Sequence, residues 1–121
     1  MEFNKEIVLE YLKTYREANA ERHKLEAKKR RCGCDMSKHE MERLNFLAER
    51  CEMVEEWLDM LPDDKVFVIQ RHLIDEVDFK RIEIEHAERW HEYGKSERTL
   101  KRYQKNALEK IIKYSNNMTK M

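Results

Sequence analysis

The sequence contains almost no residue that would interrupt a helix. Its 121 residues include only two glycines and one proline, the residues least favourable inside a helix. Glutamate, lysine, arginine and leucine, which favour helices, are abundant. Charged residues make up 41% of the chain and apolar residues 40%, which leaves enough apolar surface for one core. We therefore predict an all-α protein.

Two long helices are predicted in the first half of the chain, over about residues 2–30 and 38–60. In the second, apolar residues recur at alternating steps of three and four, as in a heptad repeat. This seam consists of Leu44, Leu47, Cys51, Val54, Leu58 and Leu61. The pattern predicts that residues 1–60 form an antiparallel helical hairpin. Packing within one chain and dimerisation would bury the same residues, so both remain open.

Residues 61–114 carry the signals of three further helices. Pro62 indicates a helix start, because the N–H that proline lacks would have no partner there. Asp78 and Ser96 are the expected N-caps of the next two helices. We expect residues 115–121 to form a frayed tail.

Charge is arranged in blocks, although the chain has no net charge. Residues 22–31 carry six bases against one acid, residues 40–64 carry nine acids against two bases, and residues 95–113 carry seven bases against two acids. A DNA-binding surface needs only a locally positive potential. The zero net charge therefore does not exclude a DNA-binding protein.

The last predicted helix, residues 96–113, separates its bases from its apolar stripe. The stripe consists of Leu100, Tyr103, Ala107 and Ile111, and the bases of the first two turns are Arg98, Lys101, Arg102 and Lys105. Such a helix can enter the major groove of DNA, where arginine and lysine donate to guanine or to phosphates. An ordinary solvated face is the alternative. The scarcity of acids on this face, and the capped helix and polar loop before it, favour a helix-turn-helix.

The segment LPDDKVFVIQRHLIDEVDFKRI, followed by SERTLKRYQKNALEKI, resembles region 4 of sigma-70-type factors. The matching positions are Leu61, Pro62, Phe79, Ile82, Ser96, Leu100, Ala107, Leu108 and Ile111. The whole chain is similar to small phage and prophage transcriptional regulators (ArpU- and RinA-like), which join such a module to an N-terminal helical segment. The motif-bearing part spans residues 61 to about 112, and the N-terminal half matches only in helical character.

The resemblance implies a sequence-specific DNA-binding transcriptional regulator with double-stranded DNA as its partner. Residues 61–114 would be the DNA-binding domain, and the hairpin would dimerise or contact RNA polymerase. The implied DNA-binding residues are Lys95, Ser96, Glu97, Arg98, Thr99, Lys101, Arg102 and Lys105. Two features depart from the family. The segment IEHAERWHEYGK is longer than a sigma-factor turn, and Glu97 stands where the family commonly has a basic residue. The DNA target sequence of the family therefore does not carry over to this chain.

Two other classes of function stay open. One is a phage DNA-packaging subunit, similar to a small terminase, that uses the same helix-turn-helix within a ring. The other is a helical interaction module whose acidic second helix binds a basic partner without DNA. We expect no enzyme and no cofactor, because the sequence has no Ser/His/Asp arrangement, glycine-rich phosphate loop or His-Glu-x-x-His motif.

Cys32, Cys34 and His39 are candidate metal ligands. Zinc usually takes four ligands and favours Cys-x-x-Cys pairs, whereas this chain has Cys-x-Cys, so we favour free thiols over a metal site. No apolar run reaches the roughly 18 residues of a membrane span, and Glu2 and Lys5 interrupt any export signal. We therefore expect a cytoplasmic protein.

Overall fold

The computed structural model describes residues 2–32, 35–90 and 95–119. Its regular elements within these ranges are α1 (Lys5–Cys32), α2 (Lys38–Met60), α3 (Asp63–Ile69), the π-helical turn η2 (Gln70–Ile74), α4 (Phe79–Trp90) and α5 (Glu97–Thr119). All of them are helical, so the predicted all-α class is confirmed. None of the described helices is long and apolar enough to cross a membrane.

Local side-chain bonds define where several helices begin. The Ser37 hydroxyl accepts the Glu40 N–H, and the Glu40 carboxylate accepts the Ser37 N–H, both at 3.1 Å. This capping box fixes the start of α2. Asp78 and Ser96 each accept the N–H three residues ahead, at 3.0 and 3.2 Å, which confirms both predicted N-caps. Pro62 stands at the N-cap of α3, one residue before the helix.

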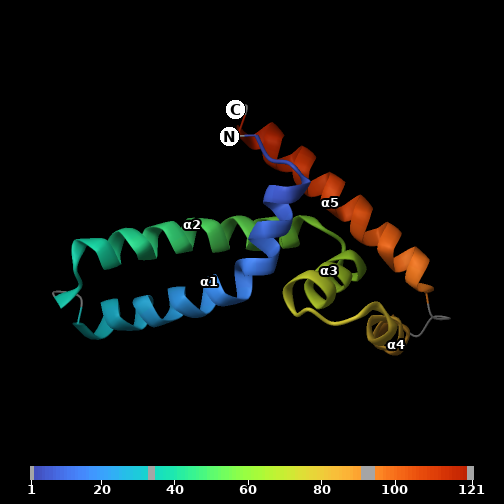
Figure 1. Cartoon of the computed structure of the whole chain (residues 1–121), viewed down its shortest axis with the longest axis horizontal. Coiled ribbons are helices and arrows are strands. Elements are labelled where there is room, and N and C mark those ends of the chain that lie inside the picture. The colour runs from blue at the N-terminus through green and yellow to red at the C-terminus, as the bar shows by residue number, and fades with distance from the viewer. Residues whose placement is uncertain (1, 33–34, 91–94, 120–121) are drawn as a thin grey trace.

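α2 runs back alongside α1, as Figure 1 shows. Most of the predicted seam is buried: Leu44, Leu47, Cys51, Val54 and Leu61. Leu58 is only partly buried and packs at the edge of the core. Ion pairs also join the two helices, including Arg22 with Glu55 at 3.2 Å and Lys28 with Glu40 at 2.6 Å.

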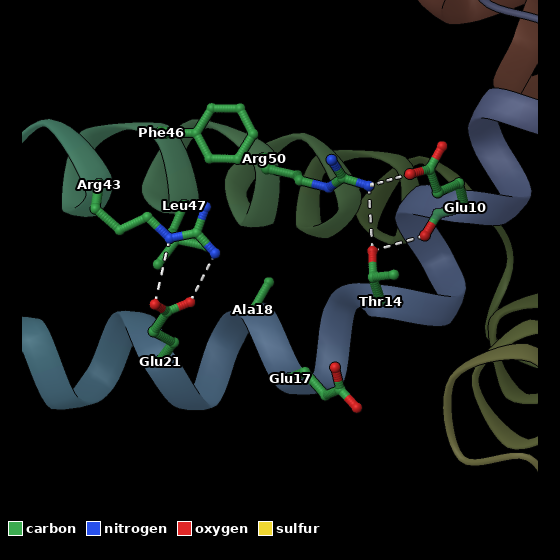
Figure 2. Close-up of a pocket in the computed structure, with 9 residues that line it drawn as sticks. All are labelled: Glu10, Thr14, Glu17, Ala18, Glu21, Arg43, Phe46, Leu47 and Arg50. Atoms are coloured by element: carbon green, nitrogen blue, oxygen red, sulfur yellow. Dashed lines mark hydrogen bonds and ion pairs between the residues drawn. The ribbon is translucent and has the colours of Figure 1, made fainter.

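α1 bends in its first half. The Thr14 hydroxyl donates to the Glu10 carbonyl oxygen one turn earlier, at 2.7 Å. Such a bond competes with the helical ladder and bends helices. Thr14 lies where the ribbon changes direction in Figure 2. The bend directs the first turns of α1 toward α5, while the rest of α1 follows α2 (Figure 1).

The larger hydrophobic core draws on both halves of the chain. Its members are Phe3, Val8, Leu12, Val54, Trp57, Leu61, Ile69, Leu73, Ile74, Ala107, Leu108 and Ile111. A smaller core of Val68, Phe79, Ile82 and Leu100 lies between α3, α4 and α5. The expected division at residue 60 therefore does not separate two cores, because α1, α2 and α5 enclose the same apolar side chains.

α5 continues through Thr119, beyond the predicted end at residue 113 and into the segment expected to be a tail. Ser115 is buried. The Asn116 side chain accepts the Phe3 N–H at 2.7 Å and donates to the Phe3 carbonyl at 3.0 Å. The tail expectation is thus wrong as far as Asn116, because contacts with the N-terminal segment hold the helix there. Figure 1 shows the last turns of α5 beside the segment that precedes α1.

Candidate nucleic-acid interface

One face of α5 anchors the helix in the protein. Leu100 and Ile111 are completely buried, and Ala107 and Leu108 nearly so. Tyr103, the remaining member of the predicted stripe, is half-buried. The Lys65 ammonium lies 3.3 Å from the centre of its ring, which is a cation–π contact. The predicted stripe therefore faces inward, and the position of α5 is set by packing along its length.

Three bases on the opposite side of α5 point to solvent: Arg98, Arg102 and Lys105 are all exposed. Their spacing of four and three residues places them on one stripe. None of them forms an ion pair with another residue in the described part of the chain. Glu109 is exposed farther along the helix. The first turns of α5 thus present an uncompensated positive stripe.

Glu97 and Lys101 differ from these three bases because they pair with each other. The Lys101 ammonium lies 3.3 Å from the Glu97 carboxylate and 5.6 Å from the centre of the Phe79 ring. Both side chains of the ion pair are largely exposed, at 59% and 44%. An exposed pair of this kind contributes little stability and exchanges readily for another partner.

The remaining expected DNA-binding residues lie at the start of α5. The Ser96 side chain caps the helix by accepting the Thr99 N–H, and the two hydroxyl oxygens lie 3.1 Å apart. Lys95, half-buried, comes just before this cap. The free N–H groups of a helix start carry a partial positive charge, which adds to that of the bases. The structure brings all eight expected residues to one end of α5.

α4 is held beside α5 by apolar packing and against η2 by one charged cluster. Phe79 and Ile82 pack in the smaller core. The Arg71 guanidinium donates two bonds to the Glu85 carboxylate, both at 2.9 Å, and one to Asp75 at 3.0 Å. These bonds raise the pKa of Arg71 and lower the pKa of Glu85. These bonds of Arg71 could not be predicted from the sequence, because no local pattern links residues 71 and 85.

The long segment between the two last helices is helical in its first part. α4 extends to Trp90, whose ring stacks on the buried His86 at 4.6 Å between centroids. It also meets the Phe67 ring edge-on at 5.2 Å. Residues 91–94 of the predicted loop lie outside the described residues. The extra length relative to a sigma-factor turn is thus partly taken up by α4.

No ion pair within the described ranges joins an acid of α2 to the stripe on α5. Glu40 and Glu55 pair with bases of α1, and Glu56 accepts a hydrogen bond from Tyr114, farther along α5 than the stripe. The Arg43 guanidinium makes two bonds to the Glu21 carboxylate, at 3.2 and 2.9 Å (Figure 2), and these bonds lower the pKa of Glu21. Figure 2 also shows Arg50 directed at Thr14 and Glu10, with Phe46 on the outer side of α2. The first turns of α5 lie at the opposite end of the molecule from the turn between α1 and α2 (Figure 1).

The candidate metal ligands are only partly described. Cys32 and His39 are exposed, and Cys34 lies outside the described residues. No group of three or more potential metal ligands occurs among the residues that the structure describes. Cys51 is fully buried on the seam of α2, and burial raises the pKa of its thiol. Its environment is that of a core residue.

Comparison of the chain with protein-family models, with curated proteins and with solved structures found no match.

Proposed function

We propose that this chain is a sequence-specific DNA-binding regulator of transcription, of the phage or prophage type. In this proposal α5 enters the major groove with its first turns, and α4 lies across its inner side as the first helix of a helix-turn-helix. The observation that carries the proposal is the exposed stripe of Arg98, Arg102 and Lys105 on a helix whose opposite face is buried.

The stripe suits DNA for a physical reason. A single α-helix fits the major groove, and long basic side chains from its first turns reach guanine O6 and N7. Arg98 and Arg102 lie in these turns and would contact bases, whereas Lys105 lies a turn later and would contact a phosphate. Lys101 would exchange its exposed pairing with Glu97 for a phosphate. The rigid attachment of α5 to the core limits the entropy lost on binding.

The α1–α2 hairpin would serve a second role in such a regulator. It projects away from the α5 stripe (Figure 1), so a partner bound there would leave the DNA face open. Phe46 of α2 is 51% exposed. We assign the hairpin to dimerisation or to contact with RNA polymerase.

The test compares substitutions on and off the stripe. Duplexes that bind the wild-type chain are first selected from a random pool. Arg98→Ala and Arg102→Ala should each weaken binding to the selected duplex by about 1–3 kcal/mol, or roughly 5- to 150-fold in Kd. Lys110→Ala is the matched control, because Lys110 is exposed on α5 but lies off the stripe.

Circular dichroism should show the same helix content in all of these variants. Unchanged affinity in both arginine variants would contradict the proposal. If the wild-type chain shifts no duplex even at low salt, a helical interaction module becomes the better assignment. Ring-shaped oligomers in light scattering would instead favour a DNA-packaging subunit.

A further inference from the structure

A groove of about 430 Å³ runs between the first turns of α1 and the middle of α5. Its rim carries four lysines: Lys5 and Lys13 from α1, and Lys101 and Lys105 from α5. Apolar side chains, among them Leu73 and Phe79, form its floor. No carboxylate belongs to the described lining residues. The groove therefore concentrates positive charge on a surface that adjoins the stripe of α5.

The two lysines of α1 are available for an external partner. Lys5 and Lys13 are exposed, and neither forms an ion pair with a residue in the described ranges. Acids of the same helix face α2 instead: the Glu21 carboxylate lies 2.9 Å from Arg43, and the Glu10 carboxylate 3.8 Å from Arg50 (Figure 2). In the first half of α1, Lys5 and Lys13 thus line the groove, whereas the Glu10 carboxylate is directed at α2.

The floor of the groove is held by contacts between η2, α4 and α5. The His72 ring stacks on Phe79 with 4.0 Å between centroids. Its Nδ1 lies 2.6 Å from the Gln104 side-chain oxygen, within hydrogen-bonding distance. Leu73 and Leu108 of the groove belong to the larger core together with Val8 and Leu12 of α1, so this core sets how α1 lies against α5. Packing therefore sets the backbone positions from which the four lysines extend.

We infer that this groove receives the phosphate backbone of the duplex whose major groove α5 enters, with Lys5 and Lys13 contacting phosphates. This inference rests on the proposed function. Lys101 and Lys105 belong both to the basic side of α5 and to the groove rim, so a strand bordering the major groove would pass along the rim. A row of lysines binds the evenly spaced negative charges of phosphates and does not distinguish one nucleobase from another.

The test is the salt dependence of binding. Each phosphate contact contributes about 0.9 to the slope of log K against log salt concentration. The slope is negative, so the double variant Lys5→Gln/Lys13→Gln should make it shallower by about 1.8. It should weaken binding to the selected duplex and to a random duplex by the same factor, because phosphate contacts carry no sequence information. Arg102→Ala should instead reduce the ratio of the affinity for the selected duplex to the affinity for the random duplex.

The matched control is Lys24→Gln/Lys38→Gln, which removes the same charge from two exposed positions on the distant part of the hairpin. Its slope should stay close to that of the wild type. A Lys5→Gln/Lys13→Gln variant that binds with the wild-type slope overturns the groove assignment while the proposed function stands. A wild-type chain that binds no duplex at low salt overturns both. Thermal unfolding measured alongside shows whether a variant is folded.

Discussion

A substitution inside the hairpin should destabilise α5, although the two are far apart in sequence. Val54 of α2 is completely buried in the larger core, which also contains Ala107 and Ile111 of α5. Val54→Ala removes two buried carbons, worth about 0.8 kcal/mol each, and leaves a small cavity. We expect the free energy of unfolding to fall by about 2 kcal/mol.

The assay compares a signal from α4 with a signal from all the helices. The chain has two tryptophans, so Trp57→Phe leaves Trp90 of α4 as the only tryptophan, and its fluorescence then reports on α4. Circular dichroism follows all helices, of which α1 and α2 are among the longest. In the Trp57→Phe background, Val54→Ala should lower the urea midpoint by about 1 M, for a slope of roughly 2 kcal/mol per M. The shift should be equal in both signals, because one core unfolds as a unit.

A different result would refute this reasoning. If the Trp90 transition keeps its midpoint while the circular dichroism transition moves, the C-terminal helices unfold independently and the shared core does not couple them. Glu52→Ala is the control, because Glu52 is exposed on the same helix. It should change the free energy of unfolding by no more than about 0.5 kcal/mol.

Two further predictions concern titration and reactivity. Because Arg71 lowers the pKa of Glu85 in the folded protein, the stabilisation is fully present above the pKa of an unfolded glutamate, about 4.3, and is lost as the pH falls through the lower folded pKa. Glu85→Gln should thus lower the free energy of unfolding by about 1 kcal/mol at pH 7, with a smaller loss near pH 3. An equal loss at the two pH values would contradict an ion pair between Arg71 and Glu85. Cys51 is fully buried with a raised thiol pKa, whereas Cys32 is exposed. Alkylation at pH 8 should therefore modify Cys32 in the native state and Cys51 only in denaturant, and rapid native modification of Cys51 would contradict its placement.

Much of the local structure could be predicted from the sequence, because helices depend on signals close together in the chain. The range 38–60 predicted for the second helix matches α2. The caps at Asp78 and Ser96 depend on a hydrogen bond across three residues. The division of α5 into a buried stripe and an exposed basic stripe follows from the helical repeat of 3.6 residues. The predicted roles of the bases on α5 remain predictions.

Contacts between distant residues could not be predicted in this way. The continuation of α5 through Asn116 depends on hydrogen bonds to Phe3, which is 113 positions away. The clamp between Arg71 and Glu85 joins residues 14 positions apart. The sequence contains the partners but does not indicate which of the many charged residues meet.

The sequence by itself determined the helices of this protein, their buried faces and the basic character of α5, because each depends on neighbours within a few turns. Only the tertiary structure decided that α1, α2 and α5 share one core and that Lys5 and Lys13 face the bases of α5. The reason is geometric: a surface assembled from two helices depends on how they pack and bend. A linear pattern of residues does not specify that arrangement.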